Sequence, residues 1–281
     1  MKSTKKAEKK LSISDLSKLE NIFSSKSWPI KSEVGESIFD SFCNMLSSFE
    51  QEEIDLILDL TKDFLWVNES QYIMLFCESF RELFEKQLSA GIQQIVLCPL
   101  LSESDINKPK SSIILLYFIK ANLLALQSRF RQINIYIIDS PTAYNPAELL
   151  ENHSLCLIDD FIGTGSTAIS AVNYFIDKQI NIASISILSL VAMRSGIDFL
   201  RQNGYNTVAT IILDKGIEGS VNADQKYKVM EMIEAKIAVK ADYHLGFGHS
   251  EALVKMVRTP NNTFPIYWLR NKKNPYAPFP R

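Results

Sequence analysis

The chain has 281 residues, of which 46% are hydrophobic and 22% are charged, and its formal net charge is −2. This composition is typical of a globular protein with a sizeable core, and it excludes an overall electrostatic attraction to nucleic acid or membranes. The length allows either one large α/β domain with an appendage or two domains.

Residues 1–10 are rich in lysine and hold a single glutamate. We expect a disordered, solvated arm, with contact to nucleic acid or to an acidic partner as the alternative. The segment that follows has no apolar run typical of a signal peptide, and the longest charge-free stretch is too short to span a bilayer. The four cysteines are widely spaced and include no Cys-x-x-Cys. These features predict a cytoplasmic protein with reduced thiols and no membrane association.

Residues 11–91 are expected to form a helical N-terminal region without a strand. In the stretch 47–66, Ser48 is a candidate helix cap, and the apolar residues that follow recur at helical spacing. The stretch 69–91 repeats this pattern and ends at Gly91, a residue type common just after helices.

Residues 92–240 alternate between apolar runs and amphipathic stretches. Strands are predicted at 92–100, 133–139, 155–159, 183–192 and 207–214. Helices are predicted at 111–130, 167–178, 194–203 and 222–239. Because strands that alternate with helices and are apolar on both faces form covered parallel sheets, we expect a parallel α/β core. The aromatic, proline-rich residues 241–281 are expected to form an irregular C-terminal segment.

Two adjacent carboxylates, Asp159 and Asp160, follow the predicted strand 155–159. Ligands of parallel α/β sheets bind beyond the carboxyl ends of the strands. There, two carboxylates can accept hydrogen bonds from the diol of a ribose, either directly or through a Mg²⁺ that keeps its waters. The pair therefore predicts a site for a sugar, with Mg²⁺ as the cofactor.

The turn after the aspartates has the opposite polarity. It consists of Gly163, Thr164, Gly165, Ser166 and Thr167. Free backbone N–H groups and the helix dipole favour an anion such as a phosphate, and glycine lets the backbone approach it closely. One short segment is thus predicted to recognise both ends of a ribose 5-phosphate. The alternative is a strand-turn-helix corner in which Asp and Thr only cap the helix.

The stretch LIDDFIGTGST resembles the signature of type I phosphoribosyltransferases. The resemblance implies a type I phosphoribosyltransferase-like parallel sheet flanked by helices, with an N-terminal helical region and a C-terminal hood-like segment at 241–281. It also implies that Asp159 and Asp160 hold the ribose diol of phosphoribosyl diphosphate, or of a nucleotide, and that the loop 163–167 holds the 5′-phosphate.

Residues 246–268 are similar to the C-terminal segment of a phosphoribosyltransferase-like family of prokaryotic conflict, or antiphage, loci. Some members of that family are encoded beside reverse transcriptases in retrons. This similarity implies a toxic effector of a defence system. It also implies a reverse transcriptase–nucleic acid complex, or another defence-system protein, as the partner.

The sequence departs from the enzyme pattern where diphosphate would leave, a step that needs Mg²⁺ and basic side chains. In the loop after the first core strand, Lys108 and Lys110 are candidates, with two solvated loop lysines as the alternative. The loop 140–153 holds no lysine or arginine. The residues therefore support binding of a ribose phosphate better than turnover. A phosphoribosyltransferase, an inactive ribose-phosphate sensor and an interaction subunit that docks through residues 11–90 all stay open.

The acceptor of a transfer reaction has weaker signals. Asp214 and Lys215 follow the last core strand and are candidates for hydrogen bonds to a base edge, while an ordinary loop is the alternative. Phe247 is a candidate to stack on a base, with a core aromatic residue as the alternative.

Overall fold

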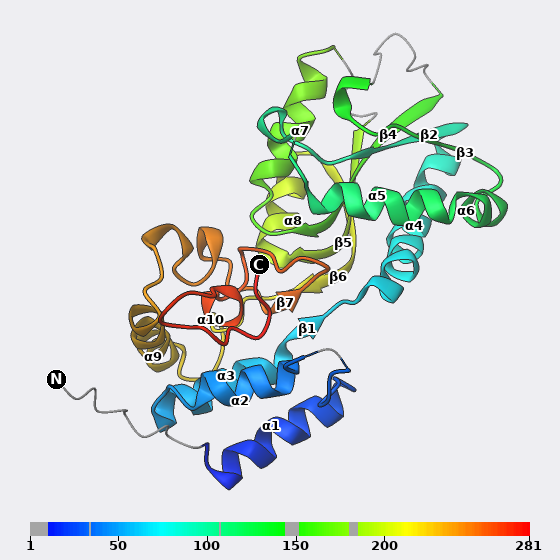
Figure 1. Cartoon of the computed structure of the whole chain (residues 1–281). Coiled ribbons are helices and arrows are strands. Elements are labelled where there is room, and N and C mark those ends of the chain that lie inside the picture. Colours follow the sequence, from blue (N-terminus) through cyan, green and yellow to red (C-terminus); the bar gives the residue numbers. More distant parts are fainter. Residues whose placement is uncertain (1–10, 34, 107, 144–151, 180–184) are drawn as a thin grey trace. The chain divides into compact units, whose positions relative to one another are not determined.

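The computed structural model describes residues 11–33, 35–106, 108–143, 152–179 and 185–281 (Figure 1). The predicted arm at 1–10 lies outside these ranges. The chain divides into two compact units, one of residues 67–214 and the other of residues 1–66 together with 215–281. These bounds differ from the ranges 11–91, 92–240 and 241–281 that the sequence suggested, because the second unit joins segments from both ends of the chain.

Unit 67–214 is built on a five-stranded parallel sheet. Its strands are β2 (Gln94–Pro99), β3 (Asn134–Ile137), β4 (His153–Ile162), β5 (Ile185–Met193) and β6 (Asn206–Leu213). They lie in the order β3-β2-β4-β5-β6, and every neighbouring pair is parallel. All nine residues of β5 are buried, as expected for a central strand that is covered on both faces.

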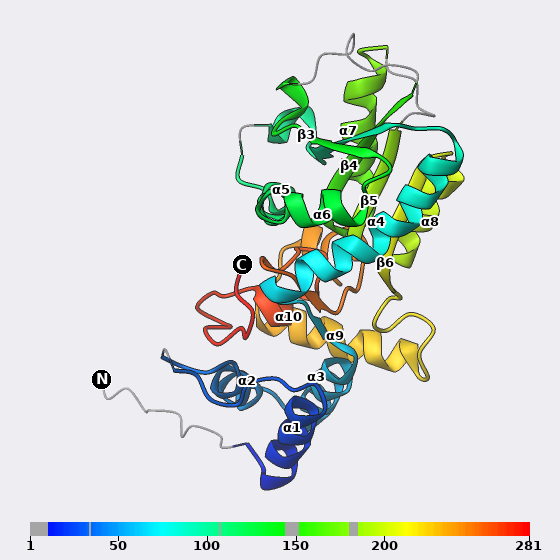
Figure 2. The same cartoon turned by 90° about the vertical axis from the view of Figure 1, so that its right-hand side faces the viewer.

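Helices cover both faces of this sheet (Figures 1 and 2). Their bounds are α4 (Tyr72–Ser89), α5 (Ser111–Ala121), α6 (Leu123–Arg129), α7 (Ser166–Ile176) and α8 (Arg194–Gln202). The apolar sides of α7 and α8 share one core with β2, β4 and β5. Helix α5 packs on β2 and β4, and α4 packs on β5 and β6. Short 3₁₀ helices lie at η1 (Glu69–Gln71), η2 (Glu103–Asp105) and η3 (Pro141–Ala143). The predicted fold class, a parallel sheet flanked by helices, is confirmed.

The helix predicted over 111–130 is two helices, α5 and α6. Asn122 between them has a non-helical backbone, and its side-chain amide donates to the carbonyl of Phe118. This local hydrogen bond competes with the helical ladder and explains the break. Within the described ranges, no single helix is long and apolar enough to cross a membrane. Helices α5 and α6 reach that length and composition only as a pair bent by 70°.

The other unit joins three N-terminal helices to the C-terminal segment. Its elements are α1 (Ile13–Ser25), α2 (Ile38–Leu46), α3 (Gln51–Asp63), β1 (Leu65–Trp66), α9 (Ala223–Lys236), η6 (Ala241–Tyr243), η7 (Phe247–His249), β7 (Val254–Lys255) and α10 (Pro265–Trp268). Their core is aromatic, with Phe64 stacked on Phe279 at a centroid distance of 5.0 Å. Strand β1 pairs with β7, although no strand was expected before residue 92. Two residues are too few to show a periodic pattern.

Candidate functional site

The candidate site lies where the order of the strands reverses. From β2 the chain crosses to β3 on one side, whereas from β4 it continues through β5 to β6 on the other. The loops that leave β2 and β4 therefore diverge from neighbouring strands. In open parallel sheets a reversal of this kind opens a crevice at the carboxyl ends of the strands. The predicted Asp pair and glycine loop follow one of these two strands, and Lys108 and Lys110 follow the other.

The sequence suggested that Asp159 and Asp160 lie at the end of the strand, but both lie inside β4. Strand β4 runs on to Ile162, because its pairing with β5 continues as far as Ile162 opposite Ala192. On the other side, pairing with β2 stops where Pro99 lies opposite Ile158. The two aspartates thus lie beyond the end of β2 but still beside β5.

The two carboxylates have different surroundings. Asp160 is only 2% exposed, and its carboxylate accepts a hydrogen bond of 2.9 Å from the hydroxyl of Tyr72 at the start of α4. Asp159 is half-buried, and its carboxylate accepts hydrogen bonds from the Ser111 hydroxyl at 3.4 Å and from the Asp160 backbone N–H at 2.9 Å. As the side chains lie, Asp159 is therefore the one with an exposed surface, and Asp160 is turned into the interior.

Both carboxyl groups titrate above their ordinary range. Burial raises the pKa of Asp159 well above the usual value, and the neighbouring charge of Asp160 raises it further. Burial also raises the pKa of Asp160, and this effect outweighs the hydrogen bonds from Ser111 and Tyr72, which lower it. Two adjacent buried carboxylates resist being charged together, so a cation or a hydrogen-bond donor beside them would stabilise their ionised form.

The predicted phosphate loop leads directly into α7. Gly165 precedes the helix with a φ of 83°, in the left-handed region that glycine adopts without strain. Helix geometry leaves the amides of Ser166, Thr167 and Ala168 without intrahelical acceptors. The Thr164 hydroxyl lies 3.0 Å from the Ser166 hydroxyl and accepts a long bond of 3.4 Å from the Ser166 amide. These amides and hydroxyls are the donors that an anion would use.

The loop rests on the first turn of α8. A Cβ placed on Gly196 would lie 2.0 Å from the carbonyl oxygen of Gly163, so the two backbones touch. Similarly, a Cβ on Gly165 would lie 3.1 Å from the Leu200 side chain. The close approach needs glycine at position 196 and holds the loop in one position.

Lys108 and Lys110 both face an acidic neighbour. Their ammonium groups lie 3.6 Å and 2.9 Å from the carboxylate of Asp105, which also accepts a hydrogen bond from Ser102. To contact a diphosphate they would have to exchange this partner. Residues 144–151 of the loop 140–153 lie outside the described ranges.

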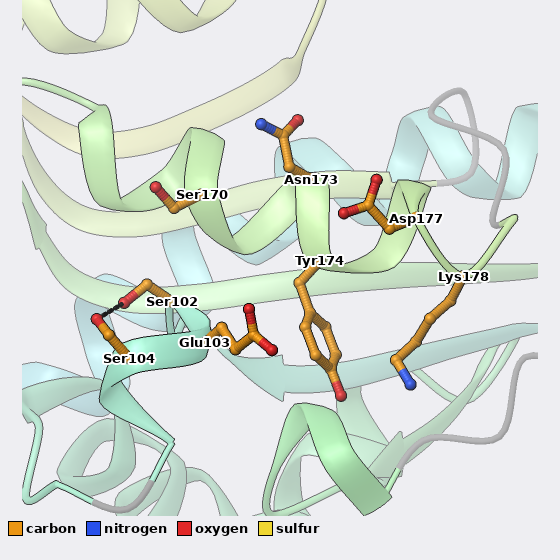
Figure 3. Close-up of a pocket in the computed structure, with 8 residues that line it drawn as sticks. All are labelled: Ser102, Glu103, Ser104, Ser170, Asn173, Tyr174, Asp177 and Lys178. Atoms are coloured by element: carbon orange, nitrogen blue, oxygen red, sulfur yellow. Dashed lines mark hydrogen bonds between the residues drawn. The ribbon is translucent and has the colours of Figure 1, made fainter.

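A hollow of about 670 Å³ lies between η2 and α7 (Figure 3). One side of the hollow is lined by Ser170, Asn173, Tyr174, Asp177 and Lys178. The other side is lined by Ser102, Glu103 and Ser104. None of these residues belongs to the predicted site. The hollow borders the helix that carries the phosphate loop, but its lining is polar and mostly exposed.

The three candidate acceptor residues do not form one described cluster. Asp214 is the last residue of unit 67–214, where its carboxylate pairs with Arg194 at the start of α8. Lys215 and Phe247 belong to the other unit, and Lys215 pairs there with Glu218 at 2.8 Å. Phe247 is 41% exposed and therefore is not a core residue.

Four residues of the site region carried no signal in the sequence analysis: Tyr72, Ser111, Arg194 and Gly196. Tyr72 contacts Asp160 from a helix 88 residues away in sequence, which no local motif could reveal. Arg194 and Ser111 each stand at the beginning of a helix that follows a strand, the usual place for ligand contacts in this architecture. Within the described residues, no three His, Cys, Asp or Glu side chains cluster closely enough to hold a metal by themselves.

Comparisons with known proteins agree with the expected type of family. A model of the family PRTase-CE matches residues 39–281. None of the curated proteins matches the chain. Among solved structures, orotate phosphoribosyltransferase from Aeropyrum pernix is 12% identical with a TM-score of 0.31, and the match covers 59% of this chain and 77% of that one. APRTase from Giardia lamblia complexed with 9-deazaadenine is 11% identical with a TM-score of 0.32, and the match covers 64% and 99% of the two chains.

Because these TM-scores are low, the structural similarities do not assign the chain to a family. The assignment rests on the sequence match with the family model. That match spans all but the first 38 residues. The prediction of a phosphoribosyltransferase-like family is thereby confirmed, and the chain belongs to the PRTase-CE family.

Proposed function

We propose that this protein binds the ribose 5-phosphate group of phosphoribosyl diphosphate or of a nucleotide at the carboxyl ends of β2 and β4. The observation that carries the proposal is the position of LIDDFIGTGST at the reversal of strand order. There, carboxylates and free amide donors follow each other within one strand-loop-helix segment. Family membership supports the same reading.

In this proposal, the 5′-phosphate lies at the first turn of α7. Its acceptor oxygens meet the amides of the loop 163–167 and the hydroxyls of Thr164, Ser166 and Thr167. Asp159, which is half-buried, receives the ribose diol. Asp160 supports Asp159 from inside the sheet, where Tyr72 holds its carboxylate in place.

Mg²⁺ is the cofactor that this donor set fits. It binds proteins through one or two carboxylates and keeps several waters or substrate phosphate oxygens, so a three-residue protein cluster is not required. Asp159, with Asp160 behind it, would hold the ion directly or through water. When bound, the ion would neutralise charge on the diphosphate and favour the ionised form of the two carboxyl groups.

Two functions fit this site, an enzyme and a sensor, and they differ in whether the bound phosphoribosyl diphosphate is turned over. A phosphoribosyltransferase would break the bond from C1′ to the diphosphate and needs cations on the leaving group. An inactive sensor needs only the binding groups. The ion pairs of Lys108 and Lys110 with Asp105, and the lack of lysine and arginine in the loop 140–153, favour the sensor.

We further propose a cytoplasmic role as an effector of an antiphage system of the retron type. The similarity of residues 246–268 to a family of conflict loci supports this role. A reverse transcriptase–nucleic acid complex or another defence protein would be the partner. Co-purification with the product of a neighbouring gene tests this point, and a chain that associates with none of them would remove it.

Calorimetric titration with phosphoribosyl diphosphate in the presence of Mg²⁺ tests the binding site. We expect Asp159→Asn to weaken binding by more than tenfold, and Asp159→Asn with Asp160→Asn to abolish it while thermal stability stays nearly unchanged. Asp139→Asn is the matched control, because Asp139 is an exposed carboxylate that follows the neighbouring strand β3. Equal binding by all variants, or unfolding of the double variant, would contradict the proposal.

Turnover is measured separately, by release of diphosphate from labelled phosphoribosyl diphosphate in a pool of nucleotides. Release that requires Asp159 identifies an enzyme. Binding without release identifies the sensor.

A further inference from the structure

Unit 67–214 is joined to the rest of the chain at two places, because it is one continuous stretch of sequence. The chain enters the unit at Val67 and leaves it at Asp214. We call residues 67–71 the first connection and residues 214–216 the second connection. Through the chain itself, a ligand of this unit can act on the other unit only at these two connections.

The first connection is short and leads directly into α4. The side chain of Asn68 accepts a hydrogen bond of 3.1 Å from the Ser70 amide, and the side chain of Gln71 accepts one of 2.9 Å from the Asn68 amide. Both bonds are local and exposed, which is typical of the segments of a fold that open most easily. Tyr72, the first residue of α4, follows at once.

The hydroxyl of Tyr72 ties the end of the first connection to the candidate site. Its side chain is fully buried and donates a hydrogen bond of 2.9 Å to the carboxylate of Asp160. Asp160 directly follows Asp159 in β4, so a ligand that fixes Asp159 also fixes the acceptor of this hydrogen bond. Ordering of the site is therefore passed to the first turn of α4.

A second side-chain pair holds the other end of the unit. Asp214 follows β6, and its carboxylate accepts a hydrogen bond from the guanidinium of Arg194, the first residue of α8. The two side chains are 69% and 53% exposed, and an ion pair this exposed is weak. Two residues after Arg194, the backbone of Gly196 touches that of Gly163 in the phosphate loop. Arg194 thus belongs to the helical turn that supports this loop.

A phosphate bound at the loop 163–167 competes with Asp214 for Arg194. It carries more negative charge than a carboxylate, and it can accept two parallel hydrogen bonds from a guanidinium. Because the exposed pair with Asp214 is weak, moving the guanidinium to the phosphate costs little. Asp214 then loses this partner, and the second connection is held less tightly.

We propose that occupancy of the ribose-phosphate site acts on the two connections of unit 67–214 in opposite directions and so passes the binding event to the other unit. This inference rests on the proposed function. The ligand orders the first connection through Tyr72, and it releases the second as Arg194 turns from Asp214 to the phosphate. Such a device gives a sensor an output without turnover. By linkage, whatever holds the connections in the ligand-bound state also raises the affinity of the site.

Hydrogen exchange of the full chain, with and without saturating phosphoribosyl diphosphate and Mg²⁺, tests this proposal. Calorimetry on the same sample reports whether the ligand binds. We expect the ligand to slow exchange at residues 67–71 and to accelerate it at residues 214–216. Each change should be about three- to tenfold, as the gain or loss of one hydrogen bond implies.

Two variants each remove one of the contacts and are compared at ligand concentrations that saturate them. Tyr72→Phe should lose the slowing at the first connection and keep the acceleration at the second. In Asp214→Asn the second connection should exchange at the ligand-bound rate before any ligand is added, and the ligand should not change it further. Because Asp214 is exposed, this variant should fold as the wild type does.

Asp139→Asn is the matched control for Asp214→Asn. Asp139 follows β3, the opposite edge strand, and is 72% exposed. Its carboxylate pairs with Lys120 of α5, but no connection between the units lies there. This variant should respond to the ligand as the wild type does.

The two measurements separate this proposal from the one on which it rests. Binding in calorimetry with any other pattern of exchange at the two connections would overturn the proposal and leave the ribose-phosphate site intact. Absence of binding by the wild type would overturn the proposed function and this inference together.

Discussion

Asp159 and Asp160 are neighbours in sequence but have different tasks in the fold. Side chains alternate across a strand, so one carboxylate points into the packed interior while the other keeps a free surface. The hydroxyl of Tyr72 satisfies the buried carboxylate at 2.9 Å. A structural partner for Asp160 thus explains how a strand tolerates two adjacent acids.

Tyr72→Phe removes a hydroxyl that donates a hydrogen bond of 2.9 Å to the Asp160 carboxylate, while Ser111 remains as a donor. The loss of one hydrogen bond to a buried charged acceptor costs about 1–3 kcal/mol. We therefore expect the free energy of unfolding to fall by about that amount, as measured by urea denaturation at neutral pH. Tyr117→Phe on α5, where the ring is 68% exposed, is the control and should unfold as the wild type does. Equal stability of the two variants would show that Asp160 does not depend on Tyr72.

Gly196→Ala tests the contact between the phosphate loop and α8. The new Cβ would lie 2.0 Å from the carbonyl oxygen of Gly163, so the loop has to move away from α8. We expect binding of phosphoribosyl diphosphate to weaken by more than tenfold in calorimetry. Ser195→Ala, one residue earlier at an exposed position of the same turn, should bind normally. Normal binding by Gly196→Ala would mean that the loop position is unimportant for the ligand.

At the scale of the residue, the sequence pointed to the candidate site residues but not to the residues that support them. The Asp pair and the glycine loop stand within one strand-loop-helix segment, and a local motif reveals them. Tyr72 and Gly196 act on that segment from distant parts of the chain, and only the packing of α4 and α8 on the sheet shows their role. The burial of Asp160 also depends on packing.

At the scale of the element, hydrophobic patterns predicted every strand of the five-stranded sheet. The central strands β2, β4 and β5 are almost entirely buried, and the partly exposed edge strands β3 and β6 still have apolar runs. The patterns did not give the length of β4, since its last residues are defined by pairing with β5 and not by their own composition. The break at Asn122 was also missed, because the apolar pattern continues across it.

Helices α3 and α9 are joined by charged pairs that predict a pH dependence. Lys226 and Lys62 lie 2.9 and 3.0 Å from the carboxylate of Asp59, and the hydrogen bond from Lys226 is the largest of the effects that lower its pKa. A lowered folded-state pKa means that this stabilisation is present above the ordinary value of 3.8 and is lost as the pH falls through the folded value. Because Asp59 is 44% exposed, solvent screening limits it to about 0.2–1 kcal/mol.

Asp59→Asn should therefore be less stable than the wild type at pH 7, and the difference should shrink in acid. Urea denaturation at pH 7 and at a pH below the ordinary aspartate pKa of 3.8 measures it. Glu231→Gln, an exposed position of α9, is the control and should show no such dependence. If the difference in unfolding free energy between Asp59→Asn and the wild type grew in acid, the predicted direction of the pKa shift would be wrong.

At the scale of the whole molecule, the division into two units could not be predicted from the order of the elements. Residues 1–66 and 215–281 form one unit because aromatic side chains from both ends, such as Phe64, Tyr267 and Phe279, share one core. Composition marks both ends as apolar but does not say that they pack together. The sequence accordingly suggested contiguous ranges.

The proposed ribose-phosphate site consists of residues of unit 67–214, which makes a prediction for the intact chain. In hydrogen exchange, phosphoribosyl diphosphate with Mg²⁺ should protect the amides of residues 163–168, because those are the free donors of the first turn of α7. The segment 245–251 of the other unit should keep its protection unchanged, because no residue of the proposed ribose-phosphate site lies in it. No gain in protection at residues 163–168, or an equal gain at both segments, would show that the ligand does not bind at the first turn of α7.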